Sequence, residues 1–285
     1  MQQIDVVVLT KNNAKTIAQC LNAIKKSIDV SRLIVIDDSE DNGETLRIVS
    51  KYTDQIHVYS GNIGEKRNHA IDLVVTPFFA FVDSDVIVNR AAYLKSMEIL
   101  QSDESIAAVH NPVISIDPRL RGKKRQILAP KKNLTFGFAL LRTEALQKSR
   151  IPQLPKGEDP ATGVRLQRLG YGVAWQGEFA CTEYKTLIDV YVHYFNYGKR
   201  GYFQGHPSRV IRRLIRRGRG MAFFVAQLFL LAGYAEYRVR NLGEPKSSEN
   251  GGNRERKPGS PRTHTARRRR RQLLSGEEEV TPVLL

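Results

Sequence analysis

Residues 4–37 read IDVVVLTKNNAKTIAQCLNAIKKSIDVSRLIVID, and this stretch decides the fold class of the chain. Two short runs of aliphatic residues, Ile4–Leu9 and Leu33–Ile36, are typical of buried strands. Between them, the apolar residues of Ala14–Lys26 recur at helical spacing. A strand–helix–strand unit of this kind joins two parallel strands through a right-handed crossover. The stretch therefore predicts an α/β domain built on a parallel sheet.

The same alternation continues outward from this unit. Helices are predicted at Glu44–Tyr52 and Glu65–Val75, and strands at Gln55–Tyr59 and Phe78–Val82. After residue 100 the pattern is looser, and the expected elements are strands within Ala107–Ile116, Phe136–Leu141, Ala174–Trp175 and Ala180–Thr182 and a short helix at Thr162–Leu169. The prediction is a mostly parallel sheet flanked by helices over residues 1–200.

Positive charge is concentrated at the C-terminal end. The 285 residues include 45 Lys and Arg against 29 Asp and Glu, a formal net charge of +16. Residues 1–198 contribute +3 of this, residues 199–240 contribute +9 and residues 241–285 contribute +4. Because the first two-thirds is nearly neutral, a protein that binds nucleic acid along its whole length is not expected.

Cysteine content and the N-terminus bear on the compartment. Cys20 and Cys181 are too few and too far apart in sequence for a disulfide scaffold or a structural zinc site. The chain begins with a strand pattern and shows no basic segment followed by an apolar run, so no secretion signal is predicted. A reducing, cytoplasmic location is the expectation.

Polar residues follow three of the predicted strands. They are Thr10–Asn13, Asp37–Gly43 and Asp83-Ser84-Asp85. The carboxyl ends of parallel strands open at one edge of a sheet, where ligands bind, so these residues should converge. An Asp-x-Asp after a buried strand can give oxygen ligands to a divalent cation that also binds phosphates. Simple turn and capping roles are the alternative, above all for Asp41 and Asn42.

The nucleotide fingerprints rich in glycine are missing from the sequence. Gly61–Gly64 matches neither the dinucleotide nor the P-loop pattern. Arg67 and Asn68 follow at the start of a predicted helix, where a guanidinium can meet a phosphate or a buried carboxylate. A surface ion pair is the alternative for Arg67.

In their order along the chain, these motifs resemble inverting glycosyltransferases of family 2, which have the GT-A fold. The matching motifs are Val6–Asn12, Ile34–Ser39, Asn62–Gly64 with Arg67-Asn68, Phe81–Asp85, Gly137-Phe138, Gly157–Asp159, and Arg165-Leu166 with Gly170-Tyr171. The similarity runs from Ile4 to about His193. Two features depart from the family pattern: Lys11-Asn12 replaces the usual aromatic residue, and Pro160 directly follows the acidic pair.

The resemblance implies specific roles for the matched residues. Those implied to bind the nucleoside-diphosphate sugar are Thr10, Asn12, Asp38, Arg67 and Asp83. Asp85, together with Asp83 and with His193 after a β-like run, is implied to hold Mg²⁺ or Mn²⁺. Gly137 and Phe138 would let the acceptor approach. Asp159 resembles the catalytic base, with Glu158 as the rival candidate, and a hydrogen-bonded core histidine is the alternative for His193.

The C-terminal third predicts contact with a membrane surface. An Arg-rich helix is expected at residues 207–219, and an apolar helix is expected over the fifteen residues Met221–Ala235. Fifteen residues fall short of the roughly 20 that span a bilayer. A basic helix beside an apolar one suits an anionic interface on the cytoplasmic side. A helix packed on the catalytic domain and a tilted span are alternatives, and residues 241–285 are expected to be a disordered basic tail.

Together these features predict a metal-dependent, inverting, nucleotide-sugar-dependent hexosyltransferase, peripheral on the cytoplasmic face of the membrane. A glycan or lipid-linked acceptor is expected. Synthesis of a surface polysaccharide or glycolipid is favoured over that of a polyprenyl-phosphate sugar, because only one medium-length apolar segment is present. Alternatives of other classes are a non-catalytic module whose tail binds nucleic acid, and a nucleotidyltransferase. The whole interpretation requires that Asp38, Asp85 and Asp159 line one cavity.

Overall fold

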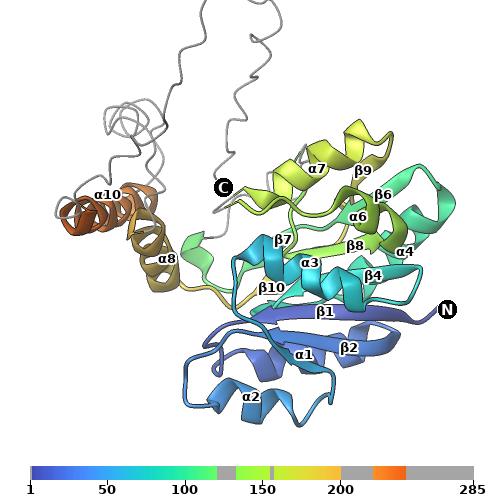
Figure 1. The fold of residues 1–285 in the computed structure, drawn as a ribbon, viewed down its shortest axis with the longest axis horizontal. Helices are drawn as coiled ribbons and strands as arrows, with labels where there is room; N and C mark the ends of the chain where they lie inside the picture. Colours follow the sequence, from blue (N-terminus) through green and yellow to red (C-terminus); the bar gives the residue numbers. More distant parts are fainter. Residues whose placement is uncertain (1, 121–132, 155–156, 200–220, 242–285) are drawn as a thin grey trace, which may run out of the picture. The chain divides into compact units, whose positions relative to one another are not determined.

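A seven-stranded sheet lies at the centre of the computed structural model, which describes residues 2–120, 133–154, 157–199 and 221–241 (Figure 1). Its strands, in spatial order, are β3 (Ile56–Val58), β2 (Val30–Asp37), β1 (Ile4–Thr10), β4 (Phe78–Asp83), β8 (Phe138–Arg142), β6 (Ile106–His110) and β9 (Gly172–Trp175). A smaller sheet contains β5 (Val86–Ile87), β10 (Cys181–Glu183) and β7 (Val113–Ser115).

The predicted parallel arrangement is confirmed for most of the large sheet. Strand β1 pairs in parallel with β2 on one side and with β4 on the other, so that Val7 lies between Ile34 and Phe81. Strand β8 is the exception, because it runs antiparallel to both β4 and β6. The apolar run of β8 is compatible with either direction, so only its pairing partners settle the direction.

Helices cover both faces of the sheet, as expected (Figure 1). The helices that contribute to the two core clusters against the sheet are α1 (Ile17–Ser27), α2 (Glu44–Val49), α3 (Ile63–Leu73), α4 (Arg90–Ser102), α6 (Thr143–Ser149) and α7 (Glu158–Arg168). Two more, α8 (Leu187–Lys199) and α10 (Met221–Asn241), lie to one side of the sheet in Figure 1. Successive residues of a strand point to opposite faces. Val6 and Val8 accordingly join the core cluster that contains Ile24 of α1, whereas Val7 joins the cluster that contains Ile71 of α3.

The β-like run expected before His193 is wrong, because His193 and the residues that precede it from Leu187 onward lie in helix α8. Helix α8 begins where the Thr186 N–H and hydroxyl both donate to Asp189 Oδ2, each at 2.7 Å. The Tyr191 ring then stacks on Phe229 of α10 with centroids 5.2 Å apart. Aromatic and β-branched residues have only a weak strand preference, and tertiary packing overrides it here.

Helices α8 and α10 approach each other closely at two glycines. A Cβ on Gly198 would overlap the carbonyl oxygen of Leu230, and a Cβ on Gly233 would overlap that of Phe195. Lys199 and Glu236 add an ion pair at 3.1 Å. The apolar segment thus forms a helix, but the predicted basic helix at 207–219 and the tail prediction lie outside the described residues. In the part of the chain that the structure describes, no helix is both long and apolar enough to cross a membrane.

Candidate active site

The polar strand ends converge at one edge of the large sheet. In the β1–β2 ladder Thr10 aligns with Asp37, and in the β1–β4 ladder Leu9 aligns with Asp83. The Asp38 N–H donates to the Thr10 carbonyl at 3.0 Å, which joins the first two strand ends. The convergence expected from the parallel pattern is therefore present.

Asp38 is held by two lysines. Its Oδ2 accepts from Lys66 Nζ of α3 at 2.5 Å and from Lys11 Nζ at 3.3 Å. Burial alone would raise the pKa of Asp38, but the two ammonium groups outweigh it and hold that pKa below its usual range. Asp38 is therefore ionised at neutral pH and is tied to α3 by Lys66.

Asn12 braces the loop after β2. Its N–H donates to Ser39 Oγ at 2.8 Å, and its Oδ1 accepts from the Glu40 N–H at 2.7 Å. Asn12 has a positive φ of 52°. Asparagine tolerates this left-handed conformation better than most residues do, so it suits this position.

The hydroxyl of Thr10 is buried, which the sequence alone does not indicate. The residue is 4% exposed, and its Oγ1 has no hydrogen-bond partner among the described residues. Leaving such a hydroxyl unpaired costs about 1–3 kcal/mol. A polar atom of a ligand that enters at this edge would remove that cost.

Arg67 of α3 links three carboxylates. Its Nη1 donates to Glu158 Oε1 at 2.9 Å and to Asp159 Oδ1 at 2.5 Å. Its Nη2 lies 3.8 Å from Asp83 Oδ1. The residue is only 4% exposed, so the surface ion pair considered for it is wrong. The buried carboxylate partner is the interpretation that the structure supports.

Aromatic rings support the same guanidinium. The Arg67 Cζ lies 4.5 Å from the ring centroid of Phe136 and 5.7 Å from that of Phe81. Ring faces attract a cation most strongly where water is excluded. Together with the carboxylates, these rings fix the orientation of Arg67, which in turn fixes its acidic partners.

The acidic pair opens helix α7. Gly157 precedes it with a φ of +84°, a conformation that glycine adopts without strain. Glu158 and Asp159 then occupy the first turn, where the helix dipole favours negative charge. Pro160 fits the same turn because a first-turn N–H needs no helical partner. The helix begins four residues before the predicted start at Thr162, so this departure from the family pattern does not disturb the pair.

Asp159 is oriented by two bonds, and Glu158 is the more deeply buried. Asp159 Oδ2 accepts from the Phe136 N–H at 3.0 Å, and its Oδ1 accepts from Arg67. The Glu158 side chain is 12% exposed, against 23% for Asp159. Burial, and next the neighbouring Asp159, raise the pKa of Glu158, while Arg67 opposes that rise.

Asp83 lies beside Gly137. The Asp83 N–H donates to the Gly137 carbonyl at 3.0 Å. A Cβ at Gly137 would lie 3.7 Å from Asp83 Oδ2, so the absence of a side chain keeps this carboxylate open. Phe138, in contrast, is fully buried in the core. The role of Gly137 and Phe138 in admitting the acceptor stays a prediction.

The Asp83–Asp85 pair fits a divalent cation. The Asp83 side chain is 52% exposed, but the protein around it reduces the hydration of its carboxylate and raises its pKa to about 6, with Asp85 and Asp159 adding to the rise and Arg67 opposing it. Burial also raises the pKa of Asp85. Two hard oxygen donors that repel each other suit Mg²⁺ or Mn²⁺, whose other positions phosphate and water fill. Within the described ranges, no group of three or more His, Cys, Asp or Glu side chains is arranged to hold a metal.

The sequence analysis did not identify the residues of the small sheet that lie near Asp85. Strand β10 pairs with β5, which places Glu183 opposite Val86, the residue after Asp85. The Tyr184 N–H donates to the Asp85 carbonyl at 2.8 Å, and Lys185 follows. No motif surrounds these residues, so no sequence signal marks them. His193 is exposed on α8, so the core-histidine interpretation is wrong, and its metal role stays a prediction.

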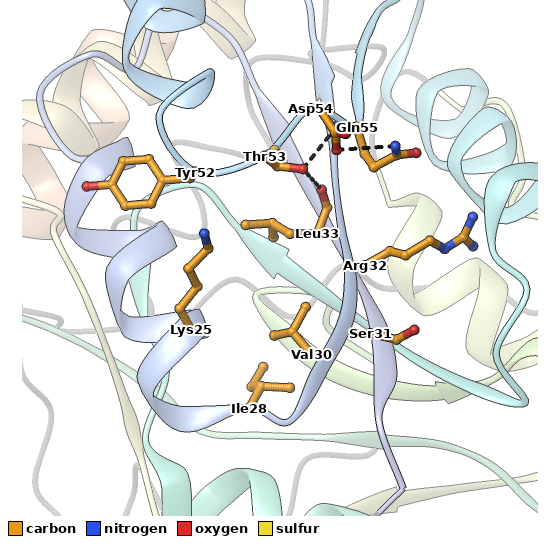
Figure 2. Close-up of a pocket in the computed structure, with 10 residues that line it drawn as sticks. All are labelled: Lys25, Ile28, Val30, Ser31, Arg32, Leu33, Tyr52, Thr53, Asp54 and Gln55. Carbon is orange, nitrogen blue, oxygen red and sulfur yellow. Dashed lines mark hydrogen bonds between the residues drawn. The ribbon is translucent and has the colours of Figure 1, made fainter.

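A separate hollow lies away from the carboxylates. It has a volume of about 510 Å³ and is shown in Figure 2. Its lining residues are Lys25, Ile28, Val30, Ser31, Arg32, Leu33, Tyr52, Thr53, Asp54 and Gln55. Val30–Leu33 are the beginning of β2, whereas Asp38 follows its end. The hollow is therefore at the opposite edge of the sheet and is no part of the candidate site.

The sequence of the chain matches the family model of Glycosyl transferase family 2 over residues 5–156, more than half of its length. The chain belongs to this family. The class that fold and site define is therefore a glycosyltransferase with the GT-A fold, and the resemblance seen in the motifs is confirmed. Membership of an enzyme family sets aside the alternative of a non-catalytic binding module.

Two curated relatives share part of this domain. Poly(ribitol-phosphate) beta-N-acetylglucosaminyltransferase TarP of Staphylococcus aureus (strain N315) is 34% identical over 101 residues, which cover 32% of this chain and 31% of TarP. The corresponding enzyme TarS of Staphylococcus aureus (strain Mu50 / ATCC 700699) is also 34% identical over 101 residues, 32% of this chain and 17% of TarS. The matched part thus spans less than a third of either relative.

Solved structures share the fold. The mannosyltransferase PcManGT from Pyrobaculum calidifontis, in complex with GDP-Man and Mn²⁺, superposes with a TM-score of 0.54 at 15% identity, over 85% of this chain and 76% of that chain. The S. aureus TarS 1–349 structure superposes with a TM-score of 0.53 at 18% identity, over 87% of this chain and 76% of that chain. At such identities the likeness shows the fold alone.

Proposed function

We propose that this chain transfers a sugar from a nucleoside-diphosphate sugar to a hydroxyl acceptor with inversion. The observation that carries the proposal is the cluster in which one buried guanidinium, that of Arg67, joins Asp83 after β4 to Glu158 and Asp159 at the start of α7. This arrangement puts an oriented carboxylate beside a pair that suits a metal–diphosphate group. Both are needed for inverting transfer without a separate acid.

Asp159 is the general base in this proposal. A base must hold its carboxylate in a fixed direction towards the acceptor hydroxyl. The bonds from Arg67 and from the Phe136 N–H give Asp159 that direction and leave lone pairs on both oxygens. Glu158 shares the same guanidinium nitrogen but is half as exposed, so an acceptor reaches Asp159 more readily.

The donor and its cation are assigned to the other half of the site. Asp85 and Asp83 would hold Mg²⁺ or Mn²⁺, which supplies positive charge to the departing diphosphate. Thr10, with its unpaired buried hydroxyl, and Asp38 would contact the nucleoside part of the donor. The complex of PcManGT with GDP-Man and Mn²⁺ supports this use of the fold.

Replacing Asp85 by alanine is expected to remove metal-dependent donor binding. Loss of a ligand from a site with two carboxylates should weaken the affinity for Mn²⁺ by about 100-fold or more. Calorimetric titration of Mn²⁺, and of UDP-GlcNAc or GDP-mannose with and without Mn²⁺, measures the effect. Asp103→Ala, an exposed carboxylate next to Ser105, is the matched control. Donor binding by Asp85→Ala that still depends on Mn²⁺ would contradict the metal assignment.

The acceptor belongs to the same proposal. TarP and TarS act, by their names, on a poly(ribitol-phosphate) polymer. A surface polysaccharide or glycolipid is therefore the acceptor class proposed here, and a polyprenyl phosphate is the alternative. Screening donors by thermal shift and then acceptors by product mass separates the two.

Peripheral binding to the cytoplasmic membrane surface is also proposed. Among the described side chains of α8 and α10, large apolar ones that are exposed include Ile188 (70%), Val192 (50%), Leu228 (46%) and Phe229 (39%). The chain between these helices, residues 200–220, carries seven Arg and no acidic residue in its sequence. Exposed apolar side chains on two helices, with concentrated positive charge in the sequence that joins them, fit an anionic interface.

The full chain is expected to float with vesicles of phosphatidylglycerol and phosphatidylcholine, and not with phosphatidylcholine alone. A variant with Leu228 and Phe229 replaced by serine should lose most of this binding, because both side chains would enter the interface. Val58 and Val75, each 73% exposed elsewhere on the molecule, provide the matched serine control. Equal flotation of the two double variants would contradict the assigned surface.

A further inference from the structure

Lys185 is anchored beside the Asp83–Asp85 pair by backbone bonds on both sides. Before it, the Tyr184 N–H donates to the Asp85 carbonyl at 2.8 Å. At Lys185 itself, the carbonyl accepts from Ser115 Oγ. After it, the Leu187 N–H donates to Asp117 Oδ2 at 3.0 Å. The turn between β10 and α8 therefore presents Lys185 at the same edge as the site.

The ammonium of Lys185 lies near several carboxylates and forms no short ion pair with any carboxylate of the described residues. Its Nζ is 3.7 Å from Glu183 Oε2, a long ion pair. Of the ion pairs that the described residues form within 4 Å, none joins Lys185 to Asp83 or Asp85. Burial would lower the pKa of Lys185, but Glu183 first and then Asp85 and Asp83 raise it. Lys185 is thus protonated at neutral pH, and 30% of its side chain is exposed.

We propose that Lys185 Nζ binds the diphosphate of the donor directly, next to the cation that Asp83 and Asp85 would hold. This inference rests on the proposed function and deepens it. A protonated lysine offers three donors on a flexible stem and is a common partner of phosphate. A cation that already has a tight carboxylate partner would have little to gain from phosphate, but the ion pair of Lys185 with Glu183 is long, at 3.7 Å.

The rival interpretation is that Lys185 only neutralises the acidic residues around it. Glu183, Asp85 and Asp83 would repel one another more strongly without its charge. The two interpretations predict effects of different size on anion binding. Loss of a direct ligand removes hydrogen bonds as well as charge, whereas loss of a neutralising charge alone weakens anion binding only through screened electrostatics.

Inorganic pyrophosphate and Mn²⁺, titrated separately by calorimetry, distinguish these interpretations. In EDTA, Lys185→Met should bind pyrophosphate at least about 10-fold more weakly than the wild type, and Lys185→Arg should retain part of the affinity. Without pyrophosphate, Lys185→Met should bind Mn²⁺ several-fold more tightly, because a positive charge beside the carboxylates is gone. Lys95→Met removes an equally partly exposed lysine that pairs with Glu98, and should change neither affinity.

Three results would overturn the inference. Pyrophosphate affinity in EDTA that is unchanged in Lys185→Met, or absent from the wild type, would leave neutralisation as the role of Lys185. A fall in both affinities together with a lower melting temperature would show a structural brace. Sugar transfer is measured independently, so a wild type that binds pyrophosphate through Lys185 but transfers no sugar would defeat the proposed function and not the pyrophosphate site.

Discussion

Asp159→Asn is expected to lower kcat by about 10²- to 10⁴-fold and to leave donor affinity nearly unchanged, because the amide cannot accept the proton of the acceptor hydroxyl. The substitution keeps the shape of the side chain but replaces one accepting oxygen by an NH2 donor. One amide oxygen can still accept from Arg67 or from the Phe136 N–H, the two donors that orient the carboxylate. Initial rates of transfer, with the donor Kd measured separately, test this expectation.

Glu158→Gln is the matched comparison for this variant. Glu158 and Asp159 accept from the same Arg67 nitrogen, so both substitutions remove one charge from the same cluster. A loss of less than about 10-fold in kcat is expected for Glu158→Gln, since it keeps the base. If Asp159→Asn turned over at a rate near wild type while Glu158→Gln did not, the base would be Glu158.

Arg67→Met is the second substitution with a large expected effect. It leaves Asp83, Glu158 and Asp159 without their shared buried cation. Removing one partner of a buried ion pair costs about 3–5 kcal/mol in the free energy of unfolding. Transfer should also fall sharply, because Asp159 loses one of its two orienting bonds. Urea unfolding and kcat/KM measure the two effects.

The stability deficit of Arg67→Met should shrink when the pH is lowered from 7 to 5. Arg67 opposes the raised pKa values of Asp83 and Glu158, so its removal raises them further. A carboxyl whose pKa is raised by folding destabilises the protein above that pKa, and this destabilisation disappears on protonation. Arg67→Lys, which keeps the charge, serves as the control. A deficit that stayed constant between pH 7 and pH 5 would contradict the electrostatic role of Arg67.

Much of the fold was predictable, because its signals are local. The alternation of short apolar runs with helical spacing over residues 4–83 depends only on near neighbours, and β1–β4 with α1–α3 agree with it. The direction of β8 and the helical state of Tyr191–Tyr194 were not predictable in the same way. They depend on the strands and the helix against which these residues pack.

The candidate site, too, was predictable from local sequence only in part. Motif order marked Asp38, Asp83, Asp85 and Asp159 together with Arg67. The role of Arg67 as the cation shared by three carboxylates became visible only when α3 and α7 came together. Lys185 and Glu183 carry no motif at all. They lie near Asp85 because β10 pairs with β5 across a long separation in sequence.

Residue order and spacing were thus enough to specify the α/β class, the strand-end carboxylates and the family. Only the tertiary structure determined the partners of Arg67, the burial of Phe138 and the exposed position of His193. It also placed the turn that contains Lys185 next to Asp85. The physical reason is the range of the forces involved. Backbone preference and periodicity act between neighbours in the chain, whereas strand pairing and ion pairing join residues whose distance in sequence carries no information about their distance in space.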